Sequence, residues 1–380
     1  MHWLGVGVWF FLLMRGAVMA DPVEERFRAA FEQVSDTGVV AMAAGYVRGD
    51  KTPVIVVRGP RFKGSEQLLK PDARWHIGSI TKSFTATVLM RMAARGEIDF
   101  DSSLSNLLPE YAADMHPNWR DLTLTEVLSH TAGIRPNFTL IQMIRSTDAD
   151  NTAARLSLLS THWGKPLPGK RGQHVYSNIG YVLAGFIAET RAGASWQDLI
   201  RREIATPLGL TSLGFGPPLG AADPWGHKRR FFVTRPVNPS GAGADNPAWL
   251  GPAGTLHMSL ADLLRWGQTH MRACRGEMPE FLSALACVRL HTPVADDYAL
   301  GWAVQTLEGL NAGPIQSHNG SNTMWVAELA YSAEHDTVLA VAMNTGDITK
   351  AESSMRLLVA ALLGVERITT PLLVPKPSKP

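Results

Sequence analysis

TMWVAELAYSAEHDTVLAVAMNTG, residues 323–346, contains two apolar runs separated by the polar segment SAEHD. This pattern predicts two β-strands. Near the other end of the chain, GVVAMAAGYV at 38–47 and PVIVVRG at 53–59 are β-rich runs joined by RGDKT, which predicts a hairpin. Because strands from both ends of the chain must pair, we expect one antiparallel sheet.

Helical patterns lie beside these strands and between them. Residues 22–35 repeat apolar side chains with helical spacing, and AESSMRLLVAALLG at 351–364 predicts a closing helix. YALGWAVQTL at 298–307 adds a strand, whereas residues 101 to about 285 mix helical patterns with long Gly/Pro-rich connections. We therefore expect an α+β fold: an antiparallel sheet flanked by terminal helices, with an inserted all-helical domain. The sheet part would comprise 21–80 and about 286–368, and the helical part about 81–285.

Composition and the two chain ends limit the partners and the location. Lys plus Arg number 36 against 34 Asp plus Glu, so no basic surface points to a nucleic acid. The apolar run Leu4–Met14 followed by Val18, Met19 and Ala20 predicts a secretory signal at 1–20, hence a periplasmic or secreted protein with no stable membrane span after cleavage. A retained anchor is the alternative, although the run is short for a bilayer. The Pro-rich stretch 369–380 predicts a disordered tail.

The only cysteines are Cys274 and Cys287. In an exported protein they could form a disulfide that closes a short loop. The alternative is two small buried thiols, and the sequence leaves both open.

WHIGSITKSF, residues 75–84, holds the only Ser-x-x-Lys of the chain, Ser79 and Lys82. A helical pattern runs from Ser79 until Gly96, so the serine stands at the first turn. Residues i and i+3 share one helical face, where a lysine amine can take a serine proton, and the helix N-terminus favours a developing anion. The alternative is that Ser79 caps the helix and Lys82 is solvated.

Two further patterns can carry chemistry. Tyr176 and Asn178 form the only Tyr-x-Asn and precede a helical pattern, so a phenol that relays a proton and an amide that holds a carbonyl could face one cleft. His318 and Gly320 stand just before the strongest strand pattern, where glycine allows close backbone approach and Ser321 offers an N–H. Taken alone, these patterns also fit a buried tyrosine beside a capping asparagine and a histidine at a strand entry.

Together and in this order, the three motifs resemble those of the serine β-lactamase and penicillin-binding protein superfamily. The tyrosine form of the second motif resembles the class C branch, which also holds D-alanyl-D-alanine carboxypeptidases, D-aminopeptidases and carboxylesterases. Three supporting stretches carry the same resemblance: LTEVLSHTAGI at 124–134, WLGPAGTLHMSLADLLRW at 249–266 and YALGW at 298–302.

The resemblance implies a role for each site residue. Ser79 would be the acylated nucleophile, Lys82 its proton partner, and Tyr176 the group that protonates the leaving atom and helps activate the deacylating water. Asn178 would hold the acyl amide of the substrate. The Ser79 and Ser321 N–H groups would form an oxyanion hole, with Gly320 in the same motif and His318 beside Tyr176. His130 and Gly133 would belong to a structural turn.

The third motif carries His318 where typical β-lactamases of this branch carry lysine, and histidine is mostly neutral at pH 7. A neutral group attracts the carboxylate of a penicillin or of a D-Ala terminus weakly, so we expect an ester or D-amino-acid peptide substrate rather than efficient β-lactam turnover. The hypothesis is an exported serine hydrolase that acts through an acyl-enzyme on a small molecule or peptide and needs no metal or organic cofactor. The alternative is a non-catalytic relative that binds cell-wall peptides or a partner.

Overall fold

The computed structural model describes residues 21–36, 38–145, 151–230, 233–306, 313–366 and 368. The expected signal segment 1–20 and the expected disordered tail 369–380 lie outside these residues. None of the helices within the described ranges is both long and apolar enough to cross a bilayer.

The main sheet has six antiparallel strands in the order β2-β1-β11-β10-β9-β8. Their bounds are β1 Met42–Arg48, β2 Val54–Arg58, β8 Ala303–Thr306, β9 Pro314–Ser321, β10 Val326–Ser332 and β11 Thr337–Met343. The N-terminal hairpin joins the C-terminal strands through β1 and β11, whose register aligns Met42 with Met343. The sheet that was expected from both chain ends is thereby confirmed.

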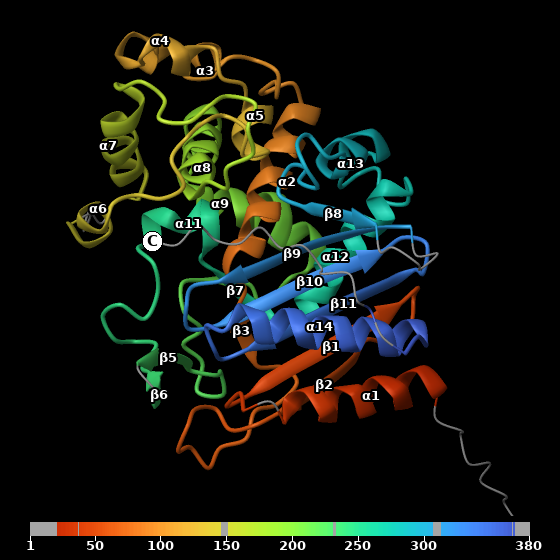
Figure 1. Cartoon of the computed structure of the whole chain (residues 1–380). Coiled ribbons are helices and arrows are strands. Elements are labelled where there is room, and N and C mark those ends of the chain that lie inside the picture. The colour runs from red at the N-terminus through yellow and green to blue at the C-terminus, as the bar shows by residue number, and fades with distance from the viewer. Residues whose placement is uncertain are drawn as a thin grey trace, which may run out of the picture.

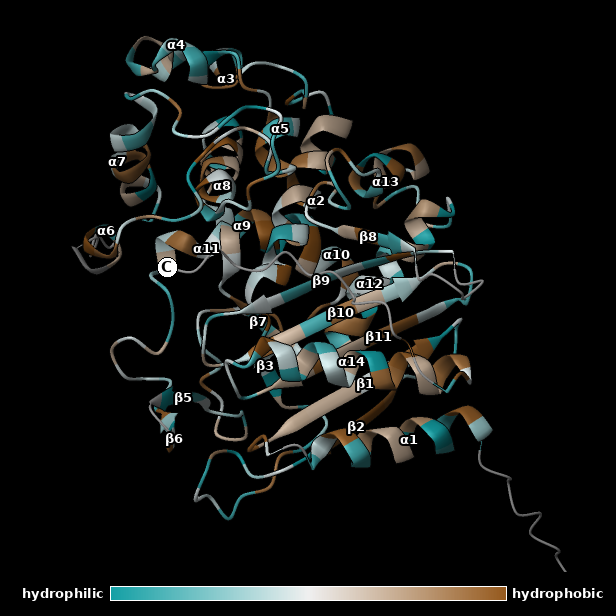
Figure 2. Ribbon diagram, viewed as in Figure 1, coloured by the Kyte–Doolittle hydropathy of each residue, from teal (hydrophilic) through white to brown (hydrophobic). Residues whose placement is uncertain are grey.

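Both faces of this sheet are covered by helices (Figure 1). The terminal helices α1 (Pro22–Ser35) and α14 (Ile348–Leu363) lie on one face, where Phe27 and Met355 join one apolar cluster with Val341. On the other face α12 (Leu260–Cys274) packs against the sheet, and Leu329 belongs to the larger core cluster there. Figure 2 shows the mixed teal and brown residues of α1 and α14, as expected for helices with one buried face.

The inserted segment is mostly helical. Its central helices are α2 Thr81–Ala94, α8 Asn178–Ala192, α9 Trp196–Ile200 and α11 Gly251–Gly254, and its outer ones are α3 Leu104–Leu107, α4 Pro117–Arg120, α5 Leu124–Leu128, α6 Leu140–Arg145, α7 Asn151–Trp163, α10 Thr206–Leu208 and α13 Ala284–His291. The segment also contributes strands to two small sheets. β7 (Leu256–Ser259) pairs with β4 (Gly214–Phe215) and with β3 (Arg74–His76), which precedes the segment, and β5 (Gly226–Arg230) pairs with β6 (Val233–Val237).

Glu328 is an exception within the apolar strand β10. Its side chain is fully buried, and neither carboxyl oxygen has a hydrogen-bond partner among the described residues. Burial, with a smaller effect of Glu352, raises the pKa of this carboxyl to about 8. The folded chain therefore holds a proton that the unfolded chain has released above about pH 4.5.

We predict that Glu328→Gln flattens the pH dependence of stability. Because the folded pKa is raised, unfolding releases a proton between pH 4.5 and 8, and stability falls as pH rises through that window. Wild type should lose about 1.4 kcal/mol per pH unit relative to the variant, or roughly 4 kcal/mol between pH 5 and 8. Urea unfolding of both proteins across this range measures the difference, with the exposed-site variant Glu110→Gln as control. Equal slopes for wild type and Glu328→Gln would contradict the assignment.

Candidate active site

Ser79 lies in a short 3-10 turn, Gly78–Ile80, between β3 and α2. Gly78 takes φ +50, which favours glycine, and a Cβ there would overlap the Ser321 nitrogen. The sequence placed Ser79 at the first turn of the helix, whereas the α-helix proper begins two residues later, at Thr81. Ser79 is not its N-cap, because Ile80 occupies that position. The Ser79 side chain is therefore available for contacts outside the helix.

Lys82 is buried in the first turn of α2 and points at Ser79. Its Nζ lies 3.0 Å from Ser79 Oγ, 2.7 Å from Asn178 Oδ1 and 2.6 Å from the Ala253 carbonyl oxygen. Burial lowers the pKa of the amine well below its ordinary value. A neutral amine has two N–H donors and one lone pair, so it can donate to Asn178 and Ala253 and accept the Ser79 proton. The arrangement suits a proton acceptor next to a partly exposed serine.

Tyr176 and Asn178 come from the start of α8. Burial raises the pKa of the Tyr176 phenol, and a hydrogen bond with Ser79 lowers it by a smaller amount. The net effect is a raised pKa, so the phenol remains protonated at neutral pH. The Tyr176 ring also lies 4.8 Å from Lys82 Nζ. Asn178 receives the lysine on its oxygen and donates from its nitrogen to Asn137 Oδ1 at 2.7 Å. The first two sequence motifs therefore meet around one serine oxygen.

The turn around His130 supports this second motif. His130 has φ +64, and its Nδ1 accepts a hydrogen bond from the Ser177 backbone at 3.0 Å. Its ring also packs against Tyr176 with 4.3 Å between centroids. These contacts hold the chain just before Asn178.

Gly320 and Ser321 bring the third motif to the same place. Both lie in β9, whose pairing with β8 ends at Ser317. A Cβ on Gly320 would overlap both the Ser79 nitrogen and the Ile77 carbonyl oxygen. Only glycine allows β9 to lie this close to the turn that carries Ser79. The backbone nitrogens of Ser79 and Ser321 thus both lie where β9 packs against the Ser79 turn.

His318 precedes β10, the strand that the sequence predicted, and itself lies inside β9, a strand that was not predicted. Its side chain is buried, with Nε2 3.1 Å from the Tyr298 hydroxyl and Nδ1 bonded to the Asn319 carbonyl. Burial lowers the pKa of His318 to about 3. The imidazole is therefore neutral at pH 7, as the sequence predicted.

Several residues around the site were not identified as functional from sequence. Tyr298, the hydrogen-bond partner of His318, stood in the quoted YALGW stretch without a role. Its ring lies between the second and third motifs, since its centroid is 6.3 Å from that of Tyr176 and 6.0 Å from that of His318. A buried pair, His76 and Asp245, joins two segments 169 residues apart.

The His76–Asp245 pair connects both sides of the close contact. His76 Nδ1 accepts from the Gly78 N–H at 3.1 Å, so Nε2 carries the proton and donates to Asp245 Oδ2 at 2.8 Å. Asp245 Oδ1 accepts from Asn322 Nδ2 at 2.9 Å, and Asn322 directly follows Ser321. The Asp245 carboxylate is thereby linked through His76 to Gly78, which precedes Ser79, and directly to Asn322, which follows Ser321.

Among the described residues, one group of histidine, cysteine and acidic side chains is close enough to share a metal ion, namely His270, Cys287 and His291. It belongs to α12 and α13, not to the elements that carry Ser79.

Known proteins resemble this chain in sequence and in fold. The sequence profile of the Beta-lactamase family matches residues 26–363. Penicillin-binding protein 4 of Amycolatopsis lactamdurans is 26% identical over 370 residues, which cover 93% of each chain. The class C β-lactamase of Rhodobacter sphaeroides superposes with a TM-score of 0.70 at 18% identity, over 89% of this chain and 99% of that one. The D-amino acid amidase of Ochrobactrum anthropi SV3, complexed with D-phenylalanine, gives a TM-score of 0.74 at 17% identity, over 90% and 99%.

Proposed function

Since this chain belongs to the Beta-lactamase family, we propose that it is a serine hydrolase that cleaves small esters and amides, including D-amino-acid amides, through an acyl-enzyme. The observation that carries the proposal is the buried Lys82 amine, 3.0 Å from the partly exposed Ser79 hydroxyl. A nucleophile within hydrogen-bond reach of a base whose pKa is lowered by burial is the arrangement that acyl transfer needs.

The lowered pKa of Lys82 and the raised pKa of Tyr176 support one proton path. Ser79 Oγ attacks the carbonyl carbon of the substrate while its proton passes to the Lys82 lone pair. Tyr176, whose pKa is raised, donates its phenolic proton to the leaving group and regains one from Lys82. Water then attacks the acyl carbonyl carbon and gives one proton to Lys82 through Tyr176. As the bond between the acyl carbon and Ser79 Oγ breaks, Lys82 returns that proton to Ser79 Oγ, and the carboxylic acid product leaves. The base of the free enzyme is therefore Lys82, and the phenol relays the proton.

The backbone N–H groups of Ser79 and Ser321 are proposed to hold the carbonyl oxygen as it becomes negative. Fixed donors of this kind act strongly because they need no rearrangement when the charge develops. Gly320 permits the approach of these two nitrogens, as the overlap of an added Cβ shows.

We predict that Gly320→Ala lowers kcat by about 10²- to 10³-fold, the effect of losing one oxyanion donor. The added methyl group would push β9 away from the Ser79 turn. Steady-state rates on one ester substrate measure the loss. Gly164→Ala is the matched control, because a Cβ there meets only ordinary contacts, at 3.5 Å and beyond. Wild-type kcat in folded Gly320→Ala would exclude this oxyanion hole.

Asp245 is proposed as a positioning residue for the same hole. Asp245→Ala leaves the His76 N–H and the Asn322 amide without their shared acceptor. We predict a fall in kcat of roughly 10- to 100-fold with little change in KM, since small displacements of reacting groups are costly. Asp245→Asn, which keeps an oxygen for His76, should recover part of the rate. A kcat for Asp245→Ala equal to that of the exposed-site control Asp114→Ala would show that the pair is not needed.

His318 limits the proposed substrate class. Its buried, neutral imidazole offers no positive charge to a substrate carboxylate. Penicillins and peptides that end in D-Ala carry such a carboxylate, whereas simple esters and amino-acid amides do not. We therefore infer that substrates without this carboxylate, namely simple esters and amino-acid amides, turn over faster than penicillins and D-Ala peptides. This agrees with the D-amino acid amidase among the structural relatives.

The test of the function uses two covalent probes and four substrates. A fluorophosphonate should label Ser79, as located by mass spectrometry of the digested protein, and a fluorescent penicillin should label it more slowly. Rates on p-nitrophenyl butyrate and D-phenylalanine amide should exceed those on nitrocefin and a D-Ala-D-Ala peptide. Absence of any Ser79 adduct in folded protein would reject the hydrolase and favour a binding protein. A high rate on nitrocefin alone would reject only the substrate class.

We also propose that the protein is exported. The apolar segment 4–14 with Val18, Met19 and Ala20 supports a leader. The disulfide between Cys274 and Cys287 supports an oxidising compartment. N-terminal sequencing of protein recovered from the periplasm or the medium tests this, and a mature chain that begins at Met1 would exclude cleavage.

A further inference from the structure

Two neighbouring helices carry the same pair of metal-binding residue types in opposite order. In α12, His270 precedes Cys274 by four residues, and in α13, Cys287 precedes His291 by four. Residues at i and i+4 lie on one helical face. Each helix therefore presents one sulfur and one imidazole toward a common point.

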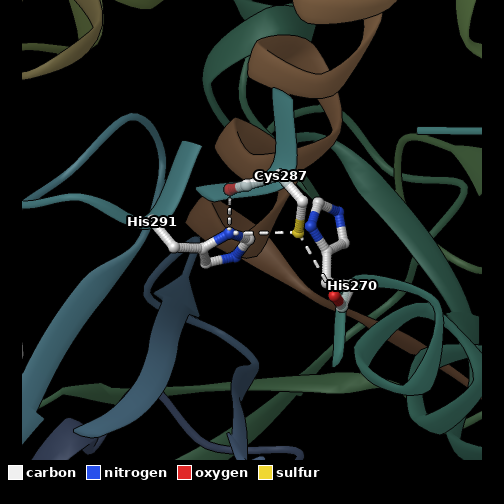
Figure 3. Close-up of side chains that lie close together, drawn as sticks. All are labelled: His270, Cys287 and His291. Atoms are coloured by element: carbon white, nitrogen blue, oxygen red, sulfur yellow. Dashed lines mark hydrogen bonds between the residues drawn. The ribbon is translucent and has the colours of Figure 1, made fainter. Parts of the chain in front are cut away.

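His270, Cys287 and His291 lie close together between the two helices (Figure 3). Cys274 and Cys287 form a disulfide, which decides between the two alternatives that the sequence left open. His291 Nδ1 lies 3.5 Å from Cys274 Sγ and 3.6 Å from Cys287 Sγ. Three residues, His270, Cys287 and His291, each offer one possible ligand atom, and these three atoms lie within 4.8 Å of one another. Once the S–S bond is broken, these side chains are close enough to share one metal ion.

Each imidazole has one nitrogen held by a protein oxygen and one left over. His270 Nε2 contacts Thr87 Oγ1 at 3.3 Å, and His291 Nδ1 contacts the Cys287 carbonyl at 2.8 Å. Within the described part of the chain, His270 Nδ1 and His291 Nε2 are buried without a hydrogen-bond partner. Buried polar atoms are rarely left unpaired, so these two nitrogens are free to bind a ligand. In the disulfide state the His291 nitrogen near the sulfurs is Nδ1, so the His291 ring must turn to present Nε2 to an ion bound by the sulfurs. Holding the second nitrogen is how proteins orient metal-binding histidines.

We propose that His270, Cys274, Cys287 and His291 bind one Zn²⁺ ion when the disulfide is reduced. In the first step a dithiol gives two electrons and two protons to the Cys274–Cys287 disulfide, which becomes two thiols while the dithiol becomes a disulfide. In the second step Zn²⁺ displaces both thiol protons and binds the two thiolates and the two imidazoles.

Charge and ligand type favour zinc at this position. Two thiolates and two neutral imidazoles cancel the charge of Zn²⁺, so the buried site carries no net charge. Two Cys and two His are a common ligand set of tetrahedral structural zinc sites. The same sulfurs cannot serve both bonds, so the oxidised chain holds a disulfide and the reduced chain holds the metal. This site is independent of the proposed hydrolase chemistry.

The test uses Co²⁺ as a coloured substitute for Zn²⁺. Full-length protein is reduced with a phosphine, desalted without oxygen and titrated with Co²⁺ while absorbance and circular dichroism are recorded. We expect one equivalent to bind with a thiolate-to-cobalt charge-transfer band and tetrahedral visible bands, and Zn²⁺ to displace it. The oxidised protein should show neither band.

Variants separate this site from adventitious binding by other histidines. Cys287→Ser and His291→Gln should lose the cobalt spectrum, whereas His335→Gln, outside the cluster, should keep it. Thr87→Val removes the contact to His270 together with the hydrogen bond that the Thr87 hydroxyl donates to the Ser83 carbonyl, and it should weaken metal affinity by about 10-fold or more. Zinc should also raise the melting temperature of the reduced wild type, or restore its native circular dichroism if reduction unfolds it. No thiolate band together with no such stabilisation would overturn the proposal, as would the same spectrum in Cys287→Ser or in oxidised protein.

Discussion

Replacing Ser79 with alanine is expected to abolish turnover of every ester and amide substrate and to leave the fold intact. The change removes one oxygen that contacts Lys82 Nζ and the Tyr176 phenol, and it leaves the backbone N–H in place. Removing one member of a nucleophile–base unit lowers kcat by on the order of 10⁴- to 10⁶-fold. Any residual rate would come from the oxyanion hole and substrate binding alone.

The measurement combines rates with labelling. Ser79→Ala should form no adduct with a fluorophosphonate or a fluorescent penicillin, and its circular dichroism and melting curve should match those of wild type. Ser160→Ala, at an exposed position of α7, is the matched control and should label and turn over normally. Substrate turnover retained by Ser79→Ala would refute the nucleophile.

The parts of the fold that could be predicted are those in which local sequence pattern and final environment agree. The helix at 22–35 has the predicted bounds because its apolar spacing matches its buried face against the sheet. β1, β10 and β11 were predicted because almost every side chain in them is buried and apolar. Both faces of the sheet are covered, so these strands appear in the sequence as continuous apolar runs.

β9 was not predicted because its composition is polar: PIQSHNGS contains Gln, Ser, His and Asn where a strand pattern calls for apolar residues. Its extended conformation comes from pairing with β10 from Ile315 to Ser321, which is tertiary context. The short strands β3, β4 and β7 were not predicted for a different reason: a strand of two to four residues is too short to show a period-2 pattern.

The site shows a similar division. Ser79, Lys82, Tyr176, Asn178 and Gly320 stood in short motifs whose order identified them, and the structure places them together. Asp245 lies in NPSGAGADNP, a composition that predicts only a loop. Its partner His76 is far away in the sequence, so no local pattern could predict their contact. Such partners are found only when the fold brings them together.

Lys82→Met carries the second large expected effect. Methionine fills a similar buried volume but offers no lone pair to the Ser79 proton, so kcat/KM should fall by on the order of 10⁴-fold or more. The wild-type pH profile gives a sharper test. Below the pKa of Lys82 the amine is a cation that cannot accept a proton, and kcat/KM should fall tenfold per pH unit.

Because burial lowers that pKa well below 10.5, full activity should extend far below the pH at which an exposed lysine becomes neutral. In Lys82→Met this acidic limb should disappear, and the small residual rate should rise with hydroxide concentration instead. Lys70→Met, at an exposed position, controls for the loss of a surface charge and should keep the wild-type profile. If activity rises only near pH 10, Lys82 remains cationic at neutral pH, and Tyr176 or another group must take the serine proton. If the acidic limb survives in Lys82→Met, it belongs to a different residue.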